Sequence, residues 1–312
     1  MIPFCRFIEN DVSYEVKYPT DIDRFTVHFE PTKHVLKYQI DQPGHIKKIQ
    51  NGINFMFSRD PFSRLWSAYL DKFFLPDFWF IGRIVIKELR LHISKTSREC
   101  GNDVTFEEVV RFIHNHRDDV RLNEHFTTVT YNCNPCKHQY DVIGKAETFK
   151  GDTDLVLANV GLLGEIAEDP DLDRVLEEIN MLIDYNLDIQ DNLVSRDGLP
   201  ESCFDNLELS KKLWRVFQIN GYIGEEIVFP TDILNDLNTR DDFRTKLKQL
   251  IADHRKGANK MELQSWKLQR TKLMQSAFNS LPDYVLRDFQ NFYSIDFELF
   301  QYERHPSWLN KR

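Results

Sequence analysis

Apolar positions recur at helical spacing along most of the chain, and only a few short runs have the character of strands. The clearest pattern lies near the first third. An apolar run at 53–57 predicts a buried strand, and the apolar residues that follow Pro61 predict a helix over 61–74. Asp60 is a good N-cap residue, and Pro61 suits the first helical position. We therefore expect a strand, a sharp turn and a helix.

The same spacing predicts further helices, and Thr105 with Glu108 forms a capping-box pattern. Helices among few strands indicate an α/β fold with a central parallel sheet flanked by helices. We expect a single domain over 1–312, with 165–262 as a helical insertion. The other predicted elements are strand-type runs at 12–18, 24–29, 34–40 and 140–143, helices at 79–93, 105–114, 148 or 152 to 160, 172–183, 241–251 and 262–288 with a break at Pro282, a turn at 198–200, and an aromatic segment at 289–302 that packs onto the core.

Composition supports a folded protein and narrows its partners. Apolar residues make up 41% of the 312 residues and aromatic residues 13%, which is enough for a sizeable core. The net charge of −9 argues against binding nucleic acid through a general positive field. The sequence shows no membrane-spanning stretch and no signal peptide, so by itself it indicates a soluble, cytosolic protein unless residues precede Met1.

Of the five cysteines, the one close pair is Cys133 and Cys136, in a CNPC sequence. Such a pair can be a redox couple, half of a zinc site or a disulfide. No second pair completes a tetrahedral set, so zinc is disfavoured. A local disulfide and two reduced thiols fit the sequence equally well, with a structural role favoured over a redox role.

Arg59 lies at the turn before the helix predicted at 61–74, and Ser67 lies about two turns further on. A guanidinium and a hydroxyl near a helix N-terminus can bind a phosphate group. An ordinary capped helix with an arginine salt bridge would give the same pattern. The pattern alone leaves both interpretations open.

The sequence RDPFSRLWSAYLDKF at 59–73 resembles the 3′-phosphate-binding motif of Golgi carbohydrate sulfotransferases of the chondroitin, dermatan and HNK-1 type. Two further blocks resemble the same family in the same order. They are NEHF at 123–126, continued by CNPC, YDVIGK and Glu147, and a C-terminal block of Leu281-Pro282 and DFELFQY at 296–302. Phe126 and Gln301 stand where the family usually has Trp and Gly.

This resemblance implies a P-loop-kinase-like sulfotransferase fold and transfer of a sulfuryl group from 3′-phosphoadenosine 5′-phosphosulfate (PAPS) to a glycan hydroxyl, without a metal. The acceptor would be a glycosaminoglycan or a glycoprotein glycan, in the Golgi lumen, on a protein held by a membrane anchor. Arg59 and Ser67 would hold the 3′-phosphate of PAPS, and Arg64 would support them. His125 is the candidate general base. A histidine that only positions its loop is the more common case.

Several other charged residues could bind a ligand, but each also has a common structural role. Lys145 and Glu147 could contact donor or acceptor, although an ion pair at a strand end is the more common role. The basic side of 83–98 could bind an acidic glycan, although a solvated helix face is more usual. Glu124, beside His125, is equally ambiguous.

One family element is missing from the sequence. The loop that grips the 5′-phosphosulfate, of the type PKVGCxxW(K/R), should precede the motif at 59–73, and nothing in 1–50 matches it. We expect either an enzyme shortened at its N-terminus or a diverged, catalytically inactive glycan- or nucleotide-binding protein on the same fold. A nucleotide phosphotransferase is disfavoured, because the sequence has no GxxxxGK[ST] motif.

Overall fold

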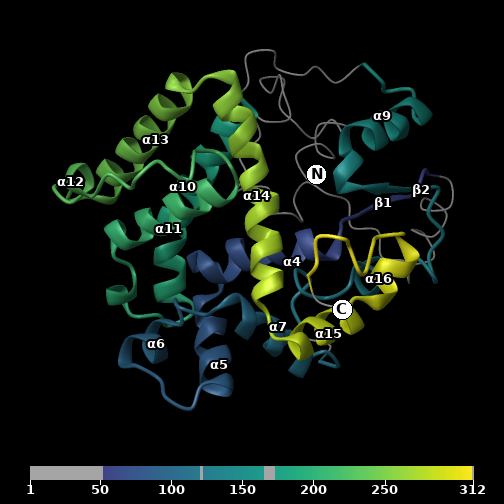
Figure 1. Cartoon of the computed structure of the whole chain (residues 1–312), viewed down its shortest axis with the longest axis horizontal. Helices are drawn as coiled ribbons and strands as arrows, with labels where there is room; N and C mark the ends of the chain where they lie inside the picture. The colour runs from purple at the N-terminus through teal and green to yellow at the C-terminus, as the bar shows by residue number, and fades with distance from the viewer. Residues whose placement is uncertain (1–51, 120–121, 165–172, 311–312) are drawn as a thin grey trace. The chain divides into compact units, whose positions relative to one another are not determined.

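The computed structural model describes residues 52–119, 122–164 and 173–310 (Figure 1). The strand-type runs predicted at 12–40 lie outside these residues. The chain divides into two compact units, one made of Met1–Arg59 with Cys133–Leu172 and the other of Asp60–Asn132 with Asp173–Arg312.

The described part of the first unit contains two parallel strands followed by a helix. Strand β1 (Phe55–Ser58) confirms the strand predicted at 53–57. Strand β2 (Val142–Lys145) begins two residues later than predicted and pairs with β1 in parallel, Phe55 opposite Val142. A short 3₁₀ turn, η5 (Ala146–Thr148), leads into helix α9 (Phe149–Asn159).

Side chains fix both ends of this strand pair. Asn54 donates its backbone N–H to the Asp141 carboxylate at 2.8 Å, and the backbone N–H of Asp141 returns a bond to the Asn54 carbonyl at 2.7 Å. At the other end, the Asp152 carboxylate accepts the backbone N–H of Lys145 at 2.7 Å. A Cβ at Gly144 would lie 2.6 Å from the Phe57 ring, so the strands pack this closely only with glycine there.

The described part of the second unit is helical and contains no strand. Its segments are α4 (Pro61–Tyr69), the π-helical turn η3 (Leu70–Phe74), the 3₁₀ turn η4 (Pro76–Phe78), α5 (Trp79–Leu89), α6 (Lys95–Cys100), α7 (Phe106–Asn115), α8 (Val129–Cys133), α10 (Arg174–Ser195), η6 (Glu201–Cys203), α11 (Asn206–Ile219), α12 (Thr231–Leu234), α13 (Arg240–Gly257), α14 (Lys260–Ser280), α15 (Asp283–Phe292) and α16 (Ser294–Leu299).

Helix α4 forms as the sequence predicts. The Asp60 carboxylate accepts the backbone N–H of Ser63 at 2.8 Å, and Pro61 occupies the first turn. The apolar face of α4 is buried. The Phe62 ring packs against the rings of Phe278, Phe289 and Phe297 at centroid distances of 4.9, 4.9 and 5.4 Å. The aromatic C-terminal segment therefore packs onto the core, as predicted.

Helices α10, α11 and α13 enclose a second core centred on Leu213 and Phe217. Helix α10 begins and ends later than predicted, and α13 extends past its predicted range at both ends. Ion pairs such as Arg244 with Asp184, at 2.8 Å, join the two helices. The capping box at Thr105 is confirmed.

The fold class is confirmed in part. The sheet is parallel, but in the described residues it has two strands, and helices make up most of the rest. In the described residues, most sequence segments outside β1 and β2 have apolar positions at helical spacing. This periodicity explains why helices dominate. The assignment of one domain with an insertion at 165–262 stays a prediction, and helices occupy the described part of that segment.

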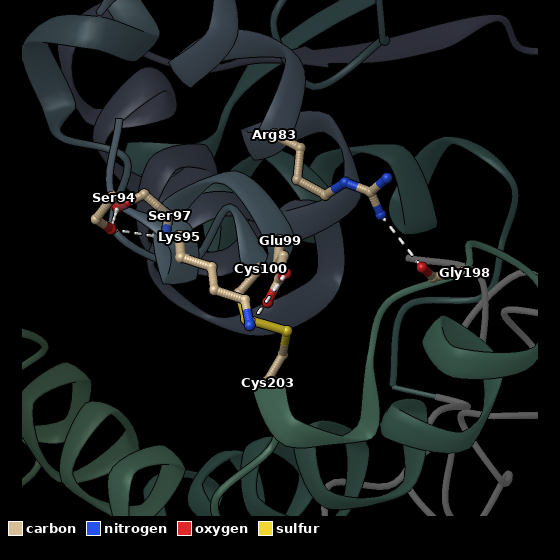
Figure 2. Close-up of a disulfide and its surroundings, with 8 residues drawn as sticks. All are labelled: Arg83, Ser94, Lys95, Ser97, Glu99, Cys100, Gly198 and Cys203. Carbon is tan, nitrogen blue, oxygen red and sulfur yellow. Dashed lines mark hydrogen bonds and ion pairs between the residues drawn. A yellow bond between two sulfur atoms is a disulfide. The ribbon is translucent and has the colours of Figure 1, made fainter. Parts of the chain in front are cut away.

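A disulfide that the sequence did not reveal joins Cys100, at the end of α6, to Cys203 in η6 (Figure 2). The Arg83 guanidinium donates to the Gly198 carbonyl at 3.3 Å beside it. Both links hold the segment between α10 and α11 against α5 and α6. Cys133 and Cys136 are not joined to each other, so the structure favours the thiol alternative for the CNPC pair.

Candidate functional site

In the first unit, the carboxyl ends of the two strands carry the basic residues. Ser58 and Lys145 face each other in register, and Arg59 follows Ser58 directly. The Ser58 hydroxyl donates to the Gly144 carbonyl at 3.3 Å, which ties the ends together. Ligands of open parallel sheets bind at the carboxyl ends of the strands. The structure therefore places Arg59 and Lys145 at the carboxyl edge of the two-stranded sheet.

In the second unit, Ser67 lies on the partly exposed side of α4. Its hydroxyl lies 3.4 Å from a guanidinium nitrogen of Arg270, on α14. No local sequence pattern predicts this contact, because 203 residues separate the two positions. A hydroxyl and a guanidinium side by side can both donate hydrogen bonds to one anion.

Arg64, predicted to support the phosphate site, is engaged elsewhere in this structure. Its guanidinium donates to the Glu124 carbonyl at 2.7 Å and to the Thr127 carbonyl. These bonds fix the loop around His125 onto α4. The motif helix and the loop of the NEHF block are thus held together by Arg64.

His125 is partly buried in that loop, next to the ring of Phe78. Its Nδ1 lies 2.6 Å from the Asn123 side-chain oxygen, which also accepts the His125 backbone N–H at 3.0 Å. Burial lowers the pKa of His125, and the positive charge of Lys72 lowers it further. The imidazole is therefore favoured in its neutral form, the form in which it can accept a proton.

Lys72, the lysine of the motif at 59–73, lies in η3 and is buried. It forms ion pairs that the sequence did not suggest. Its ammonium contacts Asp77 at 2.5 Å and Asp71 at 3.1 Å. Burial opposes its charge, but these carboxylates outweigh burial and raise the pKa of Lys72. Asp77 also accepts a hydrogen bond from the Tyr185 hydroxyl at 3.1 Å, which links the group to α10.

The C-terminal block supports the same loop. Asp296, which is 1% exposed, accepts the backbone N–H groups of Val129 and Thr130 at 2.7 and 2.9 Å. The Tyr293 hydroxyl donates to the Phe126 carbonyl at 2.5 Å. In the second unit, the three sequence blocks therefore meet at the loop that carries His125.

Several basic residues predicted along 83–98 already have hydrogen-bond or ion-pair partners within the protein. Arg90 is held by Glu108 and Asp103 at 2.6 and 2.8 Å, and hydrogen bonding to Glu108 raises its pKa. Arg83 donates to a backbone carbonyl, and Lys95 lies 4.0 Å from Glu99. These partners leave the interpretation as a glycan-binding surface without support from Arg83, Arg90 or Lys95.

The described part of the chain contains no cluster of side chains arranged to hold a metal ion. None of its helices combines the length and the apolar character needed to cross a membrane.

Comparison with known proteins adds an independent result. Residues 4–190 match the model of the sulfotransferase family. Carbohydrate sulfotransferase 11 of Rattus norvegicus is 35% identical over 135 residues, 41% of this chain and 38% of the relative. Carbohydrate sulfotransferase 14 of Danio rerio is 35% identical over 116 residues, 36% of this chain and 31% of the relative.

Carbohydrate sulfotransferase 8 of Mus musculus is 29% identical over 161 residues, 51% of this chain and 38% of the relative. The matched part of the chain thus covers less than two-fifths of the length of each of these relatives, at most 38%. No solved structure matches the chain.

Proposed function

Because the chain belongs to the sulfotransferase family, we propose that it transfers a sulfuryl group from PAPS to a hydroxyl of a glycan. The acceptor would be a glycosaminoglycan or a glycoprotein glycan. The family uses PAPS as its sulfuryl donor, which is a substrate here, and the proposal includes no metal.

In this proposal Arg59 and Ser67 bind the 3′-phosphate of PAPS, with Arg64 as a supporting residue. The 3′-phosphate lies far from the reacting sulfur, so its binding orients the donor for in-line attack. The position of Arg59 at the carboxyl end of β1 and the partly exposed hydroxyl of Ser67 both support this assignment.

His125 acts as the general base. It takes the proton of the acceptor hydroxyl as the hydroxyl oxygen forms its bond to sulfur. The bond from sulfur to the bridging oxygen breaks, and adenosine 3′,5′-bisphosphate leaves with the electron pair. The observation that carries this role is the partly buried imidazole with a lowered pKa, on a loop that Arg64 fixes to α4.

The family resemblance also leads us to propose the Golgi lumen as the site of action. The Cys100–Cys203 disulfide supports this location, because disulfides persist in oxidising compartments and are rare in the cytosol.

The second candidate is a catalytically inactive glycan- or nucleotide-binding protein on the same fold. One observation favours it: the sequence contains no recognisable loop for the 5′-phosphosulfate. Without a cation at the bridging oxygen, the charge that develops on the leaving group would be poorly stabilised.

Two measurements separate the candidates. Incubation with sulfur-labelled PAPS and a panel of desulfated glycans should give labelled glycan, and His125→Ala should slow the labelling by roughly 10²–10⁴-fold. Calorimetric titration with adenosine 3′,5′-bisphosphate tests the donor site separately. Binding without transfer would favour the inactive protein, and the absence of both would contradict the proposal.

A further inference from the structure

Arg270 lies ahead of the C-terminal residues quoted for the family resemblance, which begin at Leu281, and beyond the matched residues 4–190. It sits in the middle of α14, which contacts α4 within the second unit (Figure 1). There its guanidinium approaches the Ser67 hydroxyl at 3.4 Å. Arg270 therefore stands beside a residue of the phosphate-binding motif.

Arg270 lacks the carboxylate partners that Arg244 and Arg240 have in the same unit. Arg244 is held by Asp184 and Asp188 at 2.8 and 2.5 Å, and Arg240 by Asp191 at 2.9 Å. Among the residues that the structure describes, no carboxylate lies within ion-pair distance of Arg270. The side chain is nevertheless partly buried. A partly desolvated cation without a counter-charge favours an anion as its partner.

The charge of Arg270 acts on a buried phenol, that of Tyr222. Burial raises the pKa of Tyr222, Glu178 raises it further, and the positive charge of Arg270 opposes both. The neutral phenol of Tyr222 supplies no negative charge to Arg270.

We propose that Arg270 binds the 3′-phosphate of the sulfuryl donor together with Ser67. This inference rests on the proposed function and adds to it a residue from outside the matched part of the chain. The guanidinium fork offers two parallel hydrogen bonds to phosphate oxygens, and Ser67 offers a third. Such a site distinguishes a 3′-phosphorylated nucleotide from one that lacks this group.

The test is calorimetric titration of the full chain with adenosine 3′,5′-bisphosphate and, in parallel, adenosine 5′-phosphate. Arg270→Ala should weaken binding of the bisphosphate by about tenfold or more, as expected for loss of a charged hydrogen-bond donor. Binding of adenosine 5′-phosphate should stay unchanged. Lys272→Ala is the matched control, because Lys272 is exposed on the same helix and its loss changes the net charge equally.

Arg270→Lys keeps the charge and the long stem and is the second variant should the alanine variant fail to fold. We expect it to weaken bisphosphate binding severalfold, since an ammonium lacks the planar fork. If the unaltered chain binds no bisphosphate, the donor site itself is wrong and the proposed function fails with it. If it binds and both Arg270 variants bind equally well, Arg270 has no such role, while the proposed function stands. An equal loss for both nucleotides would also contradict contact with the 3′-phosphate.

Discussion

Asp296 caps helix α8 by accepting the backbone N–H of Val129 at 2.7 Å, across 167 residues of sequence. The same carboxylate accepts the backbone N–H and the hydroxyl of Thr130. Since α8 follows directly on the loop that carries His125, the C-terminal segment determines where that loop ends. A residue near the end of the chain thereby helps to position the candidate base.

Replacing Asp296 with alanine should destabilise the protein by about 2 kcal/mol or more, because buried donors lose a charged acceptor. Urea denaturation followed by circular dichroism measures this. Glu298→Ala, an exposed change of the same charge in α16, is the control and should have little effect. Equal stability of the Asp296 variant and the control would show that the cap is not needed.

Replacing Arg59 with alanine should weaken binding of adenosine 3′,5′-bisphosphate by ~2 kcal/mol or more, as for loss of a hydrogen bond to a charged group. Calorimetric titration gives the change directly. Arg98→Ala removes the same charge from an exposed position on α6 and should leave the affinity unchanged. Unchanged affinity in the Arg59 variant would remove Arg59 from the donor site.

His125 should give the pH profile of transfer an acidic limb below the usual histidine pKa of about 6.5. Burial and Lys72 lower its pKa, so the neutral base persists to a more acidic pH. His125→Ala should reduce the rate by roughly 10²–10⁴-fold, and His92→Ala, at an exposed position, should not. A limb centred above that value, or full activity in the His125 variant, would argue against the base.

Lys72→Met should lower the free energy of unfolding by roughly 3–5 kcal/mol, because it leaves the Asp77 carboxylate buried without its cation. Guanidinium denaturation measures the loss. Lys95→Met removes an exposed lysine 4.0 Å from Glu99 and should change stability little. The double variant Lys72→Met with Asp77→Leu should recover part of the stability, and no recovery would point to a packing defect instead.

Local signals were enough to predict part of this molecule. The strand before Arg59 and the helix after it follow from an apolar run, an N-cap at Asp60 and a proline at the first helical turn. The capping box at Thr105 was equally readable. Each of these signals depends on residues only a few positions apart.

The remaining features depend on distant residues and leave no local pattern. Nothing in the spacing of the cysteines selects Cys203 as the partner of Cys100, 103 residues earlier. The approach of Arg270 to Ser67 depends on how α14 packs against α4. Arg64 was predicted from its place in the motif, yet its bonds to the His125 loop depend on tertiary structure. The prediction of Arg59, Ser67 and His125 as site residues awaits the measurements above.

The disulfide has a consequence for shortening the protein by design. The match to the family model ends at residue 190, inside α10, whereas the disulfide bond is completed by Cys203. A chain cut where the similarity stops would carry an unpaired thiol at Cys100 and would lose α11 and α13 from the core they share with α10. The segment that matches the family model is therefore shorter than the unit that folds, and a shortened protein should keep α11, α13 and α14 and be expressed in an oxidising host.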